Sequence, residues 1–172
     1  MIAAALLVRG VEPGDAAELA ELLNAVIARG GTTALEKPFD AAGLAMRYLT
    51  GPDVHCCVVA QDDASGRLEG FQTLGRQSAL PADIGDIATF ARVDGAQRGV
   101  GTALFAATVA RARDLGLTGI NATIRADNVG GLAFYDRLGF SPHSTSAPLP
   151  LQDGSCVARV SKRFDLAARV EH

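Results

Sequence analysis

The sequence is poor in cysteine. It has three among 172 residues, of which Cys56 and Cys57 are adjacent. Three cysteines cannot form an even disulfide framework, and no pair of them stands in the CxxC spacing of a metal or redox site. We therefore expect reduced thiols in the core of a cytoplasmic protein, and no metal site.

Long apolar runs and blocks of like charge are also missing. No run reaches the roughly 18 apolar residues of a membrane helix. Residues 1–8 are apolar, but they lack a basic start and are broken by Arg9 and Gly10, so we expect a strand there and not a signal peptide. A net charge of −3 and a pI near 5.6, without a basic stripe, argue against nucleic acid as a partner. A small-molecule substrate fits this charge balance better.

The chain has the length of one domain, and 48% hydrophobic residues are ample for a single core. We expect residues 1–172 to form that domain without a linker. Helical spacing, capping residues and terminal glycines predict four helices, one capped by Asp15 and ended by Gly30, one at 40–49, one ended by Gly116, and one at 128–138. Apolar runs predict strands at 2–8, 54–61, 68–74, 86–93, 118–126 and 157–164, with a short one starting at Phe140.

The order of these elements predicts the fold class. A helix separates the fourth and fifth strands, so these two can lie parallel, whereas the strands joined by hairpins must be antiparallel. Residues 144–154 carry prolines and polar residues, and we expect a loop there. The predicted class is α/β (an α+β mixed sheet), with six to seven strands and helices on both faces.

One stretch looks like a cradle for phosphate. The apolar strand at 86–93 runs into a glycine-rich turn at 94–102, and a helix pattern follows at once. Glycines let the backbone approach an anion, and the N–H groups of a helix start favour negative charge. Two common phosphate-binding folds are disfavoured, because GxGxxG would need glycine at Leu104 and Gly101-Thr102 lacks the lysine of a P-loop.

A second motif lies one helix and one strand downstream. It consists of Asn128, Tyr135, Gly139 and Phe140, in that spacing. Taken with the turn at 98–102, it resembles the GNAT superfamily of acyl-CoA-dependent N-acetyltransferases. Two motifs in the right order and separation are a stronger signal than either alone.

The family's glycine turn is usually written (Gln/Arg)xxGx(Gly/Ala). When Gly99 and Gly101 take its glycine positions, Ala96 stands at the Gln/Arg position and departs from the pattern. A register moved by two residues has Arg98, Gly101 and Ala103 instead. We prefer the first register, because it places the family's helix start at Gly101. Backbone donors serve the pyrophosphate in either register.

The resemblance implies a GNAT-like sheet whose fourth and fifth strands splay, with acetyl-CoA as the co-substrate. Its pantetheine arm would lie between these strands and bond to their main chain, and its pyrophosphate would sit on N–H groups of the glycine turn. The residues implied in this binding are Phe90, Ala91, Val93, Gln97, Arg98, Gly99, Val100, Gly101, Thr102, Asn128 and Tyr135.

Acetyl transfer to an amine needs a neutral amine, a polarised carbonyl and a protonated leaving thiolate. The resemblance implies Tyr135 as the general acid, with packing on the sheet as its alternative role. Asp86 is our leading candidate for the base, directly or through water, with Glu36 and His55 behind it. For these three the alternatives are exposed carboxylates and a strand histidine with a satisfied side chain. Asn128 has the alternative role of a helix N-cap.

Residues 31–36 are similar to the acceptor-side loop of the phosphinothricin and amino-acid N-acetyltransferase branch. This similarity implies an α-amino acid or close analogue as the acceptor, with Thr33, Glu36 and Asp86 near it, and direct attack in a ternary complex. A homodimer, common in the family, is allowed as well. Two other functions stay open: an inactive acyl-CoA-binding or interaction module on the same fold, and a nucleotide-binding oxidoreductase that uses NAD.

Overall fold

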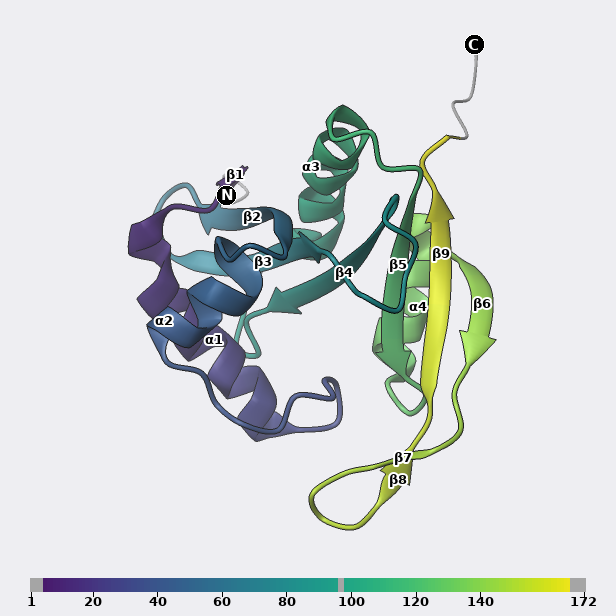
Figure 1. Cartoon of the computed structure of the whole chain (residues 1–172). Helices are drawn as coiled ribbons and strands as arrows, with labels where there is room; N and C mark the ends of the chain where they lie inside the picture. The colour runs from purple at the N-terminus through teal and green to yellow at the C-terminus, as the bar shows by residue number, and fades with distance from the viewer. Residues whose placement is uncertain (1–4, 96–97, 168–172) are drawn as a thin grey trace.

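The computed structural model describes residues 5–95 and 98–167. Within these residues, seven strands form one mixed sheet in the order β1-β2-β3-β4-β5-β9-β6 (Figure 1). The strands of this sheet are β1 (Leu6–Gly10), β2 (Val54–Asp62), β3 (Leu68–Gly75), β4 (Ile84–Ala91), β5 (Gly119–Arg125), β6 (Ser141–Thr145) and β9 (Arg159–Asp165). The helices are α1 (Ala16–Arg29), α2 (Ala41–Leu44), α3 (Val100–Asp114) and α4 (Val129–Leu138).

The pairing of β4 with β5 differs from every other pairing in this sheet. It is parallel, whereas the other neighbours are antiparallel. The parallel ladder runs from Ile84 opposite Gly119 to Ile87 opposite Ala122 and ends there. Beyond this point the two strands diverge (Figure 1). The predicted mixed sheet with parallel, splayed fourth and fifth strands is confirmed.

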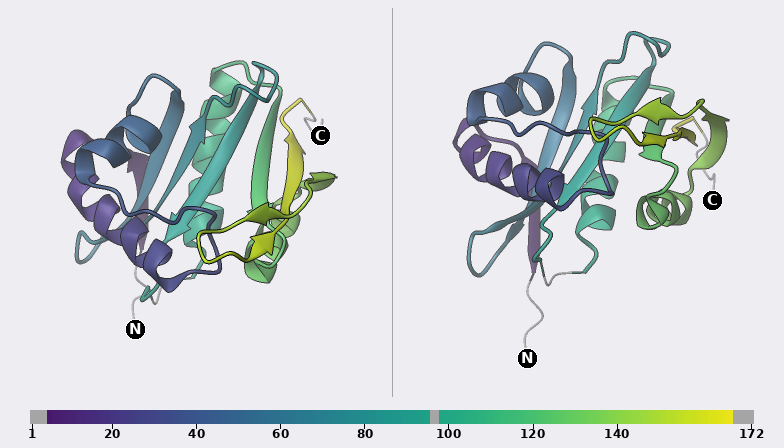
Figure 2. Two further views of the ribbon diagram at one scale, coloured as in Figure 1. Left: turned by 60° about the horizontal axis from the view of Figure 1, so that its bottom comes forward. Right: turned by 90° about the horizontal axis from the view of Figure 1, so that it is seen from below.

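Helices cover both faces of the sheet. Figure 2 shows α1 and α2 on one face and α3 and α4 on the other. Leu19, Leu22, Leu23 and Val26 give α1 an apolar side at helical spacing, and this side is buried against Phe71 and its neighbours in the sheet. On the opposite face, α3 and α4 bury their apolar residues against β2 to β5. Among the described residues, no helix combines the length and apolarity that crossing a membrane requires.

Most predicted elements are present with shifted ends. Within the described residues the first strand is Leu6–Gly10, and residues 2–4 of the predicted strand 2–8 lie outside them. Strand β4 begins and ends two residues before the predicted 86–93. Asp40 caps the second helix, since its Oδ1 accepts from Gly43 N at 2.7 Å, and α2 continues into a π-helical turn at Ala45–Leu49. The predicted helix ends at Gly30 and Gly116 are confirmed, each with a positive φ.

Three expectations were wrong. Asp15 is the N-cap residue of α1, but its side chain makes no capping hydrogen bond to that helix. Its carboxylate accepts instead from Arg9 at 2.8 and 2.9 Å and from Glu12 N, because the guanidinium is a charged donor that competes for it. The expected loop 144–154 contains the end of β6 and strand β7 (Leu149–Pro150), which pairs with β8 (Cys156–Val157). The third expectation was that all the thiols lie in the core. Cys156 on β8 is exposed, whereas Cys57 is buried and Cys56 half-buried.

Candidate active site

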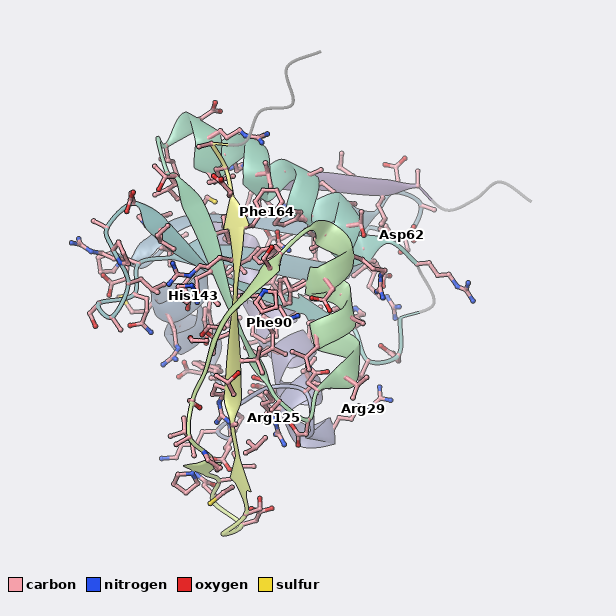
Figure 3. The ribbon with its side chains drawn as sticks, turned by 90° about the vertical axis from the view of Figure 1, so that its right-hand side faces the viewer. Arg29, Asp62, Phe90, Arg125, His143 and Phe164 are labelled. Atoms are coloured by element: carbon pink, nitrogen blue, oxygen red, sulfur yellow. The ribbon has the colours of Figure 1, made fainter. Side chains whose placement is uncertain are left out.

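The divergence of β4 and β5 opens a cavity in the sheet. Its volume is about 1010 Å³, and it is lined by both strands, by the segment after α1, by the π-helical turn before β2 and by α4. A second cavity of about 470 Å³ adjoins it, and Phe90, Ala91, Thr33 and Asn128 line both. Figure 3 labels Phe90 on β4 and Arg125 at the end of β5, on the two strands that part here. This volume lies at the upper end of the usual range for ligand pockets.

Tyr135 projects from α4 into this cavity. Its ring is buried and packs edge-on against Phe134 and Phe140. Its hydroxyl lies 3.0 Å from Oγ1 of Thr89 on β4. Burial raises the pKa of Tyr135 to about 12, and the Thr89 hydrogen bond offsets part of this rise. The phenol therefore stays protonated at neutral pH, as a general acid must.

Asp86 lines the same cavity from the start of β4. Its Oδ1 accepts from Asn121 Nδ2 at 3.0 Å, and Asn121 Oδ1 accepts from Arg163 Nε at 2.8 Å. Burial raises the pKa of Asp86 above its usual value, although Asn121 and the charge of Arg163 oppose this shift. A carboxyl with a raised pKa beside a cavity suits a general base.

The glycine turn ends at the N-terminus of α3. Gly99 has φ 80°, and the first helical hydrogen bond runs from Ala103 N to Gly99 O. The N–H groups of Val100, Gly101 and Thr102 precede that bond and have no partner within the helix. Gly101 also lines the large cavity, and a Cβ there would lie 2.7 Å from the Phe134 ring, so a side chain at this position would force the ring or the helix start to move.

The remaining turn residues lie at the protein surface or outside the described residues. Arg98 and Gly99 are exposed, as is Thr102, whereas the Val100 side chain is buried. Gln97, predicted to bind the pyrophosphate, and Ala96 lie outside the residues that the structure describes.

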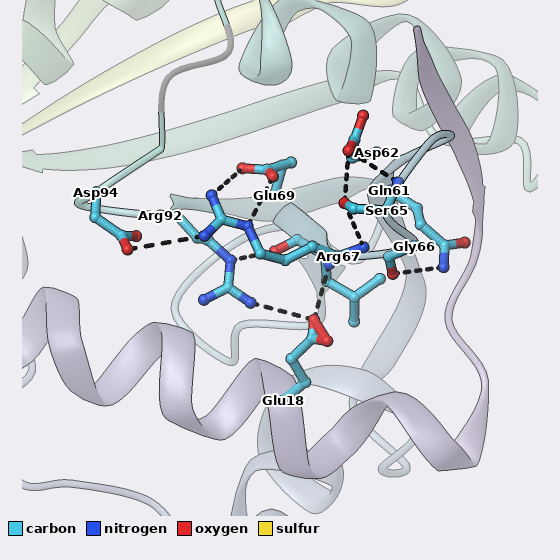
Figure 4. A network of polar contacts seen from close by, with 10 residues as sticks. Glu18, Gln61, Asp62, Ser65, Gly66, Arg67, Glu69, Arg92 and Asp94 are labelled. Carbon is cyan, nitrogen blue, oxygen red and sulfur yellow. Dashed lines mark hydrogen bonds and ion pairs between the residues drawn. The ribbon is translucent and has the colours of Figure 1, made fainter. Parts of the chain in front are cut away.

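A polar network fixes the segment between β4 and the turn (Figure 4). Arg92 donates from Nε to Leu68 O at 2.6 Å and from Nη2 to Glu18 Oε2 at 3.2 Å. Asp94 lies 3.8 Å from Arg67, which also bonds to the buried Glu69. The chain that leads into the turn is thereby tied to α1 and β3.

Val93, beside Arg92, lines the smaller cavity, and its carbonyl accepts from Arg29 Nη1 at 3.5 Å. Val93 as a whole is 38% exposed. Phe90 and Ala91, the other two strand residues predicted to hold the pantetheine arm, line both cavities.

Asn128 caps α4. Its Oδ1 accepts from Gly131 N at 2.9 Å, and its Nδ2 donates to Thr32 O at 3.0 Å. The N-cap role that the sequence left open is thus present. Since Asn128 also lines both cavities, the cap and a contact with a ligand do not exclude each other.

The acceptor-side residues are not all at the cavity. Thr33 lines it, and its carbonyl accepts from Arg125 Nη1 at 3.2 Å. Glu36 is not among the lining residues; its Oε1 accepts from Gln152 N at 2.7 Å and so ties the β7–β8 hairpin to the segment after α1 (Figure 2). His55 on β2 is also away from the cavity, and its buried Nε2 finds no partner among the described residues.

Several polar residues at the site were missed by the sequence reasoning. Thr89 contacts Tyr135, Asn121 contacts Asp86, and the cavity is also lined by Arg125 and Arg159. Strand alternation places Thr89 on the same face as Ile87, which was a usable signal. That alternation could not predict that Tyr135 on α4 contacts Thr89.

The comparisons with known proteins agree with this geometry. A family model described as acetyltransferase (GNAT) family matches residues 29–140, which is more than half of the chain. The chain therefore belongs to the GNAT acetyltransferase family. No curated protein sequence matches it.

Solved structures show the same fold at low identity. A phosphinothricin acetyltransferase from Sinorhizobium meliloti, in complex with acetyl-CoA, superposes with a TM-score of 0.79 at 19% identity, over 93% of this chain and 88% of the other. A ribosomal-protein-alanine N-acetyltransferase from Brucella melitensis gives 0.79 at 17%, over 92% and 99%. An N-acetyltransferase from Staphylococcus aureus Mu50 gives 0.80 at 16%, over 94% and 99%.

Proposed function

We propose that this protein, as a single acetyltransferase domain, transfers an acetyl group from acetyl-CoA to the primary amine of a small molecule. An α-amino acid or a close analogue is the favoured acceptor, and the amine attacks directly in a ternary complex. The observation that carries the proposal is that Tyr135 and Asp86, a protonated phenol and a carboxyl of raised pKa, line one cavity.

The residues present fit acetyl-CoA. The N–H groups at the start of α3, which have no partner within the helix, suit a pyrophosphate. Beyond Ile87 and Ala122 the facing edges of β4 and β5 are no longer paired with each other, and such edges can bond the amides of a pantetheine arm. Both features use backbone atoms, so they do not depend on the side chain at position 96.

Each candidate residue has a separate role. Asp86 accepts a proton from the ammonium of the acceptor, directly or through water, so that a neutral amine attacks the acetyl carbon. Tyr135 then gives its proton to the sulfur as the bond between the acetyl carbon and sulfur breaks. The products are the acetylated amine and the free thiol of CoA.

The charges around the cavity support an acceptor with a carboxylate. Four arginines line it, Arg47, Arg76, Arg125 and Arg159, although the whole chain has a net charge of −3. Guanidinium groups bind carboxylates through paired hydrogen bonds. An α-amino acid would present its amine to Asp86 and its carboxylate to one of these arginines.

A thermal-shift measurement tests ligand binding first. Acetyl-CoA at a hundred times its Kd should stabilise the protein by roughly 2.7 kcal/mol, which raises Tm by about 5–10 °C for a chain of this size. CoA should act similarly, and NAD should have no effect. A thiol-release assay over amino acids, polyamines and aminoglycosides then identifies the acceptor. Binding without thiol release would favour the inactive module, and a shift with NAD alone would favour the oxidoreductase.

A further inference from the structure

A buried glutamine and a threonine stand behind the phenol of Tyr135, and neither belongs to a recognised motif. Gln72 on β3 is fully buried and lies opposite Thr89 of β4 in the antiparallel ladder. Its Nε2 donates to Thr89 Oγ1 at 2.9 Å, and this oxygen lies 3.0 Å from Tyr135 Oη. The three side chains form a row from the interior of the sheet to the cavity, which Thr89 and Tyr135 line.

Because Gln72 donates to Thr89, the proton of the Thr89 hydroxyl is available to the phenol. A threonine hydroxyl has one proton and two acceptor sites. Gln72 occupies one acceptor site, and Tyr135 Oη is the other polar atom that contacts Thr89 Oγ1 within the described part of the chain. When Thr89 gives its proton to that contact, the phenol accepts, and the phenol's own proton is free to point into the cavity.

We propose that Thr89, oriented by Gln72, is a positioning residue that directs the proton of Tyr135 toward the sulfur of acetyl-CoA. The inference rests on the proposed function, because it concerns the acid of that reaction. As the bond between the acetyl carbon and sulfur breaks, sulfur keeps the bonding electron pair and takes the proton from Tyr135 Oη. Thr89 then donates to the phenolate until Tyr135 regains a proton from solvent.

The stability of the fold does not account for Gln72. Its Oε1 is buried and finds no partner among the described residues. An unpaired buried oxygen lowers stability, and an apolar side chain of the same shape would avoid this cost. A donor role toward Thr89 explains why an amide stands here.

The first test separates the hydroxyl of Thr89 from its shape. Thr89→Val keeps the volume and removes the hydroxyl, whereas Thr89→Ser keeps the hydroxyl. Misdirecting an acid forfeits part of its catalytic effect, so Thr89→Val should lower kcat about tenfold or more with KM for acetyl-CoA little changed. Thr89→Ser should retain most of kcat. Equal kcat for Thr89→Val and the natural protein, or an equal loss in both variants, would overturn the proposal.

The second test uses Gln72→Met, which removes the amide donor and the unpaired oxygen together. We expect kcat to fall severalfold while Tm stays the same or rises. A purely structural glutamine would give the opposite pair of results, a lower Tm with unchanged kcat, and that outcome would contradict the role assigned to Gln72.

The third test observes the phenol itself. The chain has two tyrosines, Tyr48 and Tyr135, and no tryptophan, so Tyr48→Phe leaves Tyr135 as the sole phenol. Uniform incorporation of a fluorinated tyrosine brings its titration into an accessible pH range, where phenolate absorbance reports the pKa. Adding Thr89→Val should raise this pKa, because the Thr89 bond stabilises the phenolate, and Thr89→Ser should not. The same pKa of Tyr135 in Tyr48→Phe alone, with Thr89→Val and with Thr89→Ser would refute a hydrogen bond between Thr89 and the phenol.

Other charges near Tyr135 are the same in these proteins. Asp86 on β4 raises the pKa of Tyr135, and Asp136, the next residue on α4, is paired with Lys162 of β9. The titration needs no turnover. If the natural protein releases no thiol with any amine, the proposed function fails, while the titration still decides whether Thr89 acts on Tyr135.

Discussion

Replacing Gly101 with alanine should disturb the contact between α3 and α4 at the expected phosphate site. A Cβ at this position would lie 2.7 Å from Cε2 and Cζ of Phe134. Carbon atoms pack at about 3.5–4.0 Å, so the ring or the first turn of α3 must move by roughly 1 Å. Phe134 lines the cavity beside Tyr135. The movement would therefore affect both the start of α3, where the pyrophosphate is expected, and the cavity that holds Tyr135.

Two opposing effects set the magnitude. Overpacking costs about 1–3 kcal/mol, and replacing glycine by alanine within a helix gains up to about 1 kcal/mol. Gly101→Ala should thus destabilise the fold by roughly 0–3 kcal/mol. Gly130→Ala in the first turn of α4 is the matched control, since its Cβ would meet only Asn128 Oδ1, at 3.9 Å. That variant should gain up to about 1 kcal/mol.

Thermal unfolding and titration calorimetry with acetyl-CoA check this prediction. Gly101→Ala should unfold at least about 2 °C below Gly130→Ala, because 1 kcal/mol corresponds to about 2–4 °C in a chain of this length. Its Kd for acetyl-CoA should rise about tenfold, equivalent to about 1.4 kcal/mol. Equal stabilisation by both alanines, with unchanged Kd in Gly101→Ala, would refute the argument from close packing.

Three further predictions concern charged side chains. The pKa of Asp86 is raised in the folded state, so ionisation of this carboxyl lowers the stability of the fold as pH rises through that pKa. Asp86→Asn should therefore be more stable than the natural protein at neutral pH but not in acid. The variant should also lose the acid limb of the pH profile of kcat/KM. Asp136→Asn leaves the amine of Lys162, which is 7% exposed, without a charged partner and should cost about 1–3 kcal/mol in chemical denaturation, whereas Lys162→Met should cost less. Arg92→Met breaks the bonds to Leu68 O and Glu18 and should raise the Kd for acetyl-CoA more than it changes kcat, as titration and steady-state kinetics would show.

Local patterns carried much of the fold. Asn128, Tyr135 and Gly139 lie on α4 and at its two ends, so their spacing in the sequence was enough to predict where they stand on this helix. The parallel pairing of the fourth and fifth strands followed from the helix between them. By contrast, the position of β9 between β5 and β6 depends on long-range pairing, which no local pattern encodes.

The polar contacts of the site show the same limit. Thr89 meets Tyr135 across 46 positions of the sequence, and Glu36 meets Gln152 across 116. Such contacts follow from the packing of whole elements and not from the residues next to them. Asp15 is the reverse case, because its local signature of a helix cap was overridden by Arg9 on the neighbouring strand.

The most direct test of the account compares Tyr135→Phe with the natural protein in thiol release, using the acceptor found by screening. Removing the phenolic proton should lower kcat about a hundredfold or more, while the Kd for acetyl-CoA measured by calorimetry stays within about twofold, since the ring remains packed. An unchanged kcat would contradict the assignment of Tyr135 as the acid, and the absence of acetyl-CoA binding to either protein would contradict the proposed function as a whole.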